Sequence, residues 1–232
     1  NIFGGLTLNG ALNLGKADGN TYGRLYFFNG AQSLTGSGTV TFGGSINNGL
    51  LAYGYNNAAT LTIGSGITIQ GGSGGLLGNY SADNVVSNAT VTIPAGSTFA
   101  MSGNNWVNGG TINASGVVVN LGGTFATSAL GNFNAAGATV NLTGTLNNAG
   151  STMTLSPAIG NWRLLGGTIS GGTVATSGGS ILTLTANGGG LVGVTIAAGT
   201  IVDGTQNING NSPNANIFGG LTLNGALNLG KA

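Results

Sequence analysis

The sequence predicts an all-β protein built as a parallel β-helix, or β-solenoid, with about nine coils per 215 residues. Three observations predict this fold. Short runs that alternate apolar and polar residues recur through all 232 residues, each broken by Gly or Asn, which is the pattern of pleated strands. The runs begin at spacings of roughly 21–34 residues, which is the size of one solenoid coil. The chain also ends with the same residues that begin it.

The two ends of the chain carry one sequence. Residues 1–17 and residues 216–232 both have the sequence NIFGGLTLNGALNLGKA, which gives a tandem repeat of period 215. Two unrelated strands would not share so long a match by chance. We therefore interpret residues 1–232 as one continuous solenoid segment, slightly longer than one period of a tandem array. Long, near-identical repeats are typical of structural fibres, stalks and surface filaments.

Each run supplies one or two short strands. Thr, Val and Ile favour the strand, and the Gly or Asn that ends it tolerates the positive φ of a sharp corner. No window shows the 3.6-residue apolar stripe and the caps of a helix, so we expect almost no helix. In chain order, the runs predicted to form strands are 6–15, 39–49, 60–72, 90–103, 116–128, 138–150, 162–179, 180–189, 191–204 and 221–230.

Stacking would make such short strands stable. One coil has no core, but stacked coils bury Leu, Ile, Val and Phe in inward columns and pair each backbone amide with neighbouring coils. At about 4.8 Å per coil, one period would rise about 43 Å along the axis. Side chains at corners can also hydrogen-bond along the axis. The asparagine pairs expected to form such corner ladders are 47–48, 56–57, 104–105 and 147–148.

Charge is almost absent from the chain. Charged residues make up 3% of it, against about 25% in ordinary globular proteins, and His and Cys are absent. This composition excludes a disulfide framework and a thiolate metal site, and it gives no electrostatic footprint for nucleic acid. No apolar run reaches the about 20 residues of a membrane helix, so no membrane span is expected. With little charge repulsion available, self-association is expected.

The acidic residues do not suggest an active site. Asp18, Asp83 and Asp203 fall in different predicted coils, whereas glycoside cleavage needs two carboxylates about 5–10 Å apart. A serine nucleophile would have no histidine base. The GxGxxG match at 188–193 is not followed by a helix pattern, so it lacks the context of a dinucleotide site. We therefore predict that the protein is not an enzyme and has no catalytic residue, metal or cofactor.

Three segments depart from the coil pattern and hold the tyrosines: 16–38, 50–57 and 76–84. We expect them to form loops or wider corners that project from the rod. Their side chains suggest a lateral contact between rods, or an aromatic patch that binds glycans. In the alternative, these aromatic residues stack inside wide coils or cap a bend. The candidate residues are Tyr22, Arg24, Tyr26, Phe28, Tyr53, Tyr55 and Tyr80.

Threonine pairs raise a different function. Thr-x-Thr pairs on one outward face would form a regular array of hydroxyls and methyls that could bind ice. Thr is also an ordinary outward residue of a strand, and the spacings of the pairs are too irregular to predict a clean ladder. The pairs are Thr39/Thr41, Thr60/Thr62, Thr90/Thr92, Thr143/Thr145, Thr152/Thr154 and Thr183/Thr185.

Two phrases carry a resemblance to a known class of proteins. With LLGGTISGGTVAT (164–176) and LVGVTIAAGTIVDG (191–204), the chain resembles the β-strand-repeat surface proteins of bacteria. It is also similar to the right-handed β-helix passenger regions of autotransporters and of filamentous-haemagglutinin-like adhesins. The resemblance implies secretion to the cell surface and a role in adhesion, sheath or matrix. It brings no fixed catalytic residues.

Together these observations predict a structural repeat of an extracellular fibre or cell-surface filament. The expected partner is the protein itself, through adjacent repeats joined end to end and through lateral bundling, with glycans or other cell-surface material as further partners. No nucleic acid partner is expected. The alternative function is an adhesin stalk that presents a tip domain.

Overall fold

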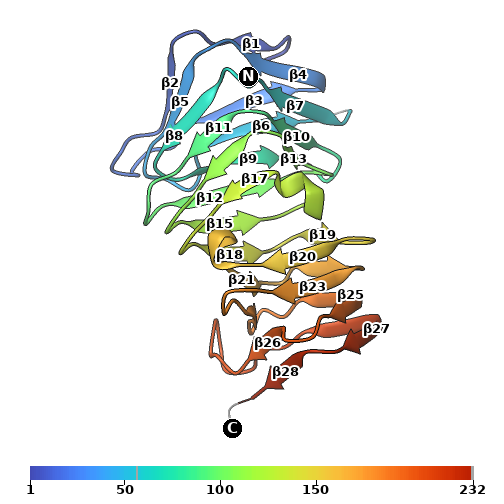
Figure 1. Ribbon diagram of the computed structural model, residues 1–232. Coiled ribbons are helices and arrows are strands. Elements are labelled where there is room, and N and C mark those ends of the chain that lie inside the picture. The colour runs from blue at the N-terminus through green and yellow to red at the C-terminus, as the bar shows by residue number, and fades with distance from the viewer. Residues whose placement is uncertain (56, 231–232) are drawn as a thin grey trace.

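The computed structural model describes residues 1–55 and 57–230, and it confirms the predicted parallel β-solenoid (Figure 1). The strands of successive coils pair in parallel along an elongated stack, from the N-terminus at one end to the C-terminus at the other. Helical structure in the described residues is limited to two short 3-10 helices, η1 (Thr127–Leu130) and η2 (Pro157–Ile159). Neither is long and apolar enough to cross a membrane.

Each of the first coils has three strands, and each strand lies on one of three faces of the solenoid. The first face contains β1 (Leu6–Thr7), β4 (Gly30–Thr35), β7 (Ala59–Ile63), β10 (Asn84–Ser87) and β13 (Val107–Asn108). The second face contains β2 (Ala11–Leu14), β5 (Thr39–Phe42), β8 (Thr68–Gly71), β11 (Thr90–Thr92), β14 (Thr111–Asn113) and β17 (Asn132–Asn134).

The third face is a single sheet of ten strands that runs the length of the stack. In order along the axis it contains β3 (Arg24–Phe28), β6 (Gly49–Tyr53), β9 (Gly74–Gly78), β12 (Thr98–Ser102), β15 (Val118–Leu121), β18 (Thr139–Leu142), β21 (Asn161–Leu164), β24 (Leu182–Leu184), β26 (Ile201–Gly204) and β28 (Ala226–Leu229). Each turn of the solenoid contributes one strand to this face, so successive strands of the face mark successive turns.

In the C-terminal half the first two faces merge into one sheet. The first face continues because Asn104, just before β13, pairs with Thr124. The seven strands of the merged sheet are β16 (Thr124–Ala126), β19 (Thr145–Asn147), β20 (Thr152–Leu155), β22 (Thr168–Ser170), β23 (Thr173–Thr176), β25 (Gly190–Ile196) and β27 (Asn216–Leu223). Strand β25 pairs with β22 through its first half and with β23 through its second half, so one strand passes through the corner between the two faces.

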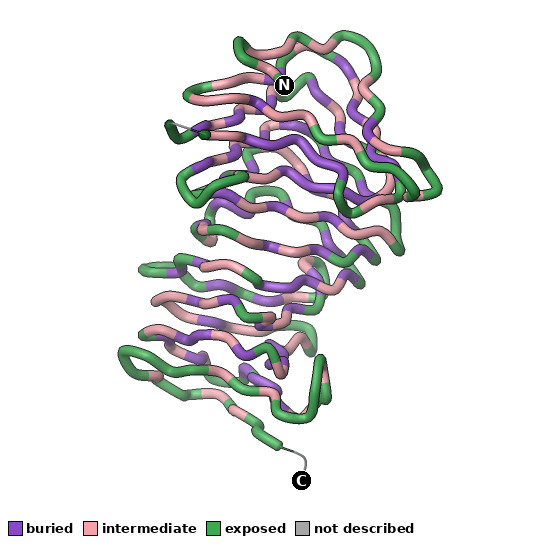
Figure 2. Tube along the Cα trace, turned by 180° about the vertical axis from the view of Figure 1, so that it is seen from behind, coloured by how far each residue is buried: buried purple, intermediate pink, exposed green. Residues whose placement is uncertain are grey.

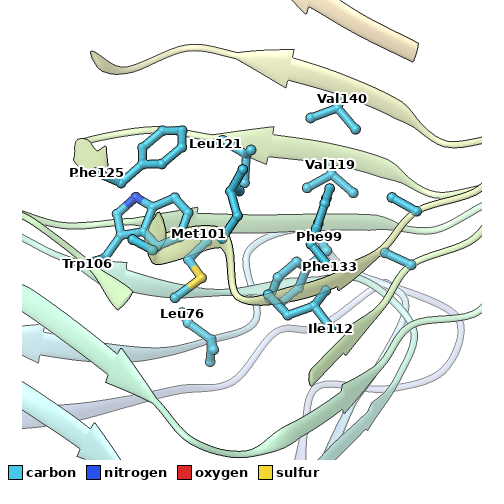
Figure 3. Packing of buried hydrophobic residues seen from close by; sticks show 14 of the residues in the cluster. Leu76, Phe99, Met101, Trp106, Ile112, Val119, Leu121, Phe125, Phe133 and Val140 are labelled. Carbon is cyan, nitrogen blue, oxygen red and sulfur yellow. The ribbon is translucent and has the colours of Figure 1, made fainter. Parts of the chain in front are cut away.

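The interior is filled by apolar columns in which each coil contributes one residue per position. On the third face, alternate residues point inward, and the residues that pair from coil to coil are themselves apolar. The longest such column is Leu25, Leu50, Leu76, Met101, Leu121, Leu142, Leu164 and Leu184. Midway along the stack, the Trp106 ring stacks on the Phe125 ring (Figure 3). The ring centroids are 4.3 Å apart. Burial of each such side chain contributes about 1.5–3 kcal/mol.

Coil size changes along the stack, and the corners absorb the change. The first coil takes the chain from Leu6 to its partner Leu34, whereas a later and shorter coil takes it from Thr90 to its partner Thr111. The extra residues of the early coils lie between strands, mainly in 15–23 and 43–48. Register on the faces is therefore kept although the coils differ in length.

Segments 16–38, 50–57 and 76–84 were expected to be projecting loops or wider corners, and the structure corrects this expectation because strands run through all three. About half of these residues lie in strands: β3 and β4 lie in the first segment, β6 runs into the second, and β9 runs into the third. Their runs of large apolar residues fill columns on the first and third faces, so they pair like the other runs. The corners in these segments are residues 15–23, 29, 36–38, 54–58 and 79–83, apart from Asn56, which lies outside the described residues.

Corner asparagines act differently from the predicted ladders. The Asn48 side chain is buried, accepts a hydrogen bond from the Gly23 amide (2.9 Å) and donates one to the Ser73 carbonyl (3.1 Å). The bonds thus run along the axis, but to backbone groups of the two neighbouring coils rather than to other asparagines. Direct Asn–Asn bonds from coil to coil join asparagines of paired strands instead. They join Asn134 to Asn113 and Asn141 to Asn120, both at 2.9 Å.

Candidate functional site

Five aromatic side chains form a continuous row on the outer side of the third face, near the N-terminal end of the stack. Strand alternation creates the row: Leu25 and Phe27 of β3 pack into the core, so Tyr26 and Phe28 point outward. We call this set the aromatic row, and it consists of Phe3, Tyr26, Phe28, Tyr53 and Tyr80.

The rings of the aromatic row contact one another from coil to coil. Phe3 stacks on Phe28 at a centroid distance of 4.9 Å, and Phe28 lies 4.5 Å from Tyr53. Tyr53 in turn meets Tyr80 nearly edge to face at 5.1 Å. Aromatic pairs at such distances contribute about 0.5–1.5 kcal/mol each beyond the area they bury. The row therefore joins successive coils by side chains as well as by backbone.

The structure brings together four of the seven predicted site residues. Arg24 precedes Tyr26 by two residues on β3, and its guanidinium carbon lies 5.3 Å from the centre of the Tyr22 ring. Tyr55 is exposed at the corner that follows β6. Phe3 was missed because it falls inside the repeated segment. The alternation of an inward Ile2 and an outward Phe3 was the signal that could have found it.

A hydrogen bond ties Tyr80 into the row. The Tyr80 hydroxyl donates to the Tyr53 hydroxyl at 3.0 Å. Loss of the Tyr80 proton would break this bond, so the bond opposes ionisation of Tyr80. Partial burial and the nearby Tyr53, Tyr55 and Asp83 oppose it further. These interactions raise the pKa of Tyr80 to about 12. Tyr80 is therefore neutral at any physiological pH.

Asp83 anchors the corner that holds Tyr80. Its carboxylate is fully buried and accepts hydrogen bonds from the backbone amides of Gly54 (3.0 Å), Ala59 (2.9 Å) and Tyr80 (2.9 Å). These amides belong to two successive corners, so one carboxylate fixes both. The residue thus has a structural role at the edge of the aromatic row.

The other two acids also hold backbone. Partial burial disfavours ionisation of Asp203, but hydrogen bonds from the Thr205 hydroxyl and amide and from the Gln206 side chain outweigh it and lower the pKa of this carboxyl below its ordinary value. Asp18 is exposed and accepts a 2.9 Å bond from the Asn20 amide. Within residues 1–55 and 57–230, no group of three or more His, Cys, Asp or Glu side chains could hold a metal ion.

A hollow of about 350 Å³ lies beside the aromatic row. Its lining combines one aromatic ring with amide and hydroxyl groups, from Asn79, Tyr80, Ser81, Ser102 and Thr124. Glycines complete the wall, so backbone is also accessible there. Such an uncharged lining suits a neutral ligand rich in hydroxyl groups better than a charged one.

The second face presents threonines in a column. Thr39, Thr68, Thr90 and Thr111 pair in register on four successive coils. A second outward column beside it contains Thr41, Gln70 and Thr92. The Thr-x-Thr pairs themselves fall on all three faces, so they form no ladder of pairs, in keeping with their irregular spacing; the column consists of single threonines from successive coils. Corners of different length compensate for the spacing, and Thr68 belongs to no Thr-x-Thr pair.

The repeated segment forms the outermost coil at both ends of the stack. We call residues 1–17 the N-terminal copy and residues 216–232 the C-terminal copy, of which 216–230 are described. In both copies the same five apolar positions pack toward the core side of the coil or pair with buried residues. They are Ile2, Leu6, Leu8, Leu12 and Leu14 in the N-terminal copy, and Ile217, Leu221, Leu223, Leu227 and Leu229 in the C-terminal copy.

The two copies are covered on opposite edges. In the N-terminal copy, Leu12 and Leu14 pair with Val40 and Phe42 of the following coil. In the C-terminal copy, the matching residue Leu227 pairs with Val202 of the preceding coil, while Leu229 remains 63% exposed. Figure 2 shows the largely exposed strands of this last coil. The two ends thus expose the two complementary edges of one coil.

Comparisons with protein families, with curated proteins and with solved structures give no match for this chain. The predicted membership of a bacterial surface-protein class therefore stays a prediction. The function has to be argued from the solenoid, its end coils and its outer faces.

Proposed function

We propose that this chain is a structural repeat of an extracellular fibre or cell-surface filament, which lengthens by continuing its coils from one repeat into the next. The observation that carries the proposal is that one repeated segment forms both end coils and exposes opposite edges there. A copy placed at a junction would be covered on both edges. The same rod also suits an adhesin stalk, a role that requires a tip domain elsewhere in the full-length protein.

The edges at a junction are able to form backbone hydrogen bonds. On the edge of the N-terminal copy toward the next coil, the carbonyls of Gly10 and Leu14 accept hydrogen bonds from the amides of Thr39 and Gly43 in that coil. In the C-terminal copy, the amide of Ala226 donates to the carbonyl of Thr200 in the preceding coil. Unpaired strand edges template the addition of further strands. Continuation therefore satisfies groups that an end coil leaves to solvent.

The walls of the rod favour side-by-side contact. The outer faces carry Thr, Asn, Ser and Gly with few charges, so two rods meet little electrostatic repulsion. The aromatic row adds an exposed apolar strip, in which the Phe3 side chain is 71% exposed. We assign lateral bundling, or contact with neutral glycans, to this strip.

Electron microscopy of a two-repeat chain tests the proposal. The test protein consists of residues 1–215 followed directly by residues 1–232, and the control is the single chain of residues 1–232. We expect a rod of unchanged width that is longer by about 43 Å, from about nine coils at about 4.8 Å. A particle that becomes wider instead of longer, or two rods joined by a flexible link, would overturn it.

Cell location needs a separate measurement. Antibodies against the purified chain should label intact source cells or their extracellular material as strongly as permeabilised cells. Labelling that appears only after permeabilisation would contradict an extracellular fibre, whatever the two-repeat chain does in the microscope.

Ice binding is a second candidate function, favoured by the threonine column of the second face. The column places Thr side chains about 4.8 Å apart along the axis, with a second column about 7 Å away along the strands. The single chain of residues 1–232 should then inhibit ice recrystallisation. Thr90→Tyr should abolish the effect, whereas Thr62→Tyr on the first face should not. An inactive parent chain would exclude this function.

A further inference from the structure

We propose that successive repeats are rotated by one face, so that each period of the tandem repeat advances by nine full turns plus one of the three faces. This inference rests on the proposed continuation of the solenoid from repeat to repeat. It follows from a difference between the two identical copies. They form the same coil, but they place it on different faces.

The N-terminal copy begins on the third face. Ile2 pairs with Phe27 of β3, through hydrogen bonds from the Ile2 amide to the Tyr26 carbonyl (2.7 Å) and from the Phe28 amide to the Ile2 carbonyl (2.8 Å). The copy then continues through β1 on the first face and β2 on the second face.

The C-terminal copy begins one face later. Ile217, which corresponds to Ile2, pairs with Leu191 in the continuation of the first face. Leu221 and Leu223 then pair with Val194 and Ile196, in the half of β25 that continues the second face. The copy ends with β28 on the third face, although the matching strand β2 of the N-terminal copy lies on the second.

The coil itself is the same in both placements. Gly5 and Gly220 both have positive φ, at 78° and 89°, and Gly15 and Gly230 both have φ of 74°. The copies differ at one corner, where Gly219 has φ of 64° and lets β27 run through the merged sheet. Matching corners mean that the shift of face is a rotation of the whole coil about the axis rather than a refolding of it.

Counting strands on the third face gives the size of the step. Ile2 lies one level above β3, and nine strands follow on this face from β3 to β26. Ile217 comes on the next face after β26. The period of 215 therefore spans nine and one third turns, or about 23 residues per turn, a usual coil length for a solenoid.

Both sets of contacts are compatible at a junction. The C-terminal copy uses the edge toward the preceding coil, and the N-terminal copy uses the edge toward the following coil. If one copy keeps both, the β3 of the next repeat lies on the first face. An in-phase junction would instead require residues 216–229 to give up their pairs with β25 and β26.

The rotation distributes the aromatic row around the fibre. In the second repeat the row would lie on the first face, in the third repeat on the second face, and in the fourth repeat again on the third. Three repeats would complete 28 turns, which is about 134 Å at about 4.8 Å per turn. The fibre would then offer its aromatic rows in every lateral direction.

Two disulfide pairs in the two-repeat chain test the rotation. The chain has no cysteine, and neighbouring coils place Cα atoms at about 4.8 Å, within the roughly 4.4–6.8 Å of a disulfide. The upper pair is Val192→Cys with Phe218→Cys, because these residues are partners on the first face. The lower pair, made in a separate variant, is Phe218→Cys with Phe28→Cys of the second repeat, because Phe3, which corresponds to Phe218, stacks on Phe28.

We expect each pair to oxidise nearly completely, measured by intact mass after alkylation of free thiols in denaturant. Formation of the lower pair alone would mean a continuous but in-phase solenoid, which overturns the rotation and leaves the proposed function intact. Formation of the upper pair alone would mean that the second repeat does not stack on the first, which overturns both. The pair Phe218→Cys with Tyr55→Cys of the second repeat is the mismatched control and should stay reduced.

Discussion

The hydroxyl of Tyr80 donates a 3.0 Å hydrogen bond to the hydroxyl of Tyr53, which lies one coil earlier on the same face. The pair joins two coils outside the core, in a region where the backbone turns a corner. It also raises the pKa of Tyr80 above the ordinary value for a tyrosine.

Titration of the tyrosines should reveal this bond. The pKa of Tyr80 is raised to about 12, so absorbance at alkaline pH should show a late ionisation step near pH 12. Because the raised pKa belongs to the folded state, its stabilising effect is complete below pH about 10 and is lost as the pH rises toward about 12. Tyr53→Phe should return the late step toward pH 10, and an unchanged late step would contradict the assignment.

Replacement of the buried carboxylate should destabilise the corner next to the aromatic row. In Asp83→Asn, an NH2 group would face backbone amides that now donate to an oxygen. Leaving buried donors unpaired costs about 1–3 kcal/mol each, so we expect a loss of about 2–4 kcal/mol in the free energy of unfolding, measured with urea. Asp18→Asn, at an exposed carboxyl, is the matched control and should change stability by less than about 0.5 kcal/mol.

Asn148 should be a stronger determinant of stability than its neighbour Asn147. The buried Asn148 side chain accepts a 2.6 Å bond from the Thr127 hydroxyl and donates a 2.8 Å bond to the Thr173 carbonyl, which lie in the coils on either side. Asn148→Ala should lower the free energy of unfolding by about 2–3 kcal/mol. Asn147→Ala should cost clearly less, because Asn147 is exposed. Equal losses in thermal or urea unfolding would contradict this role.

Acid should weaken the C-terminal coils through Asp203. Its folded pKa lies below the ordinary value because hydrogen bonds favour the charged carboxylate. The resulting stabilisation is present above the ordinary pKa and is lost as the pH falls through the folded one. The free energy of unfolding should therefore fall between pH 5 and pH 2.5 by more in the parent chain than in Asp203→Asn. An identical pH dependence in the two proteins would exclude this carboxyl as a cause.

The architecture was predictable because it depends on repetition. Alternation of apolar and polar residues, as in the run from Thr60 to Ile69, identifies strands, and glycine identifies corners. The number of strands per coil was not predictable, because long corners and short corners give the same pattern. For the same reason the segments around Tyr26 and Tyr53 were predicted as loops although they are strands.

The candidate site was predictable only as a set of residues. Tyr26, Phe28, Tyr53 and Tyr80 were identified from their clustering in the sequence, but their contacts depend on which coil lies above which. Phe3 joins them from a segment without other aromatic residues. The threonine column was missed for a related reason, since register between coils, rather than spacing along the chain, brings Thr68 between Thr39 and Thr90.

The direction of the backbone ladders has a consequence for a rod that is pulled. The hydrogen bonds between coils point along the axis, so tension on the two ends loads them one coil at a time. A coil that peels away releases about 21–28 residues, which extend from about 4.8 Å to roughly 70–90 Å. A fibre of such coils would be stiff at low force and would lengthen stepwise above a threshold, and it could take up the work of a sudden pull without breaking a covalent bond.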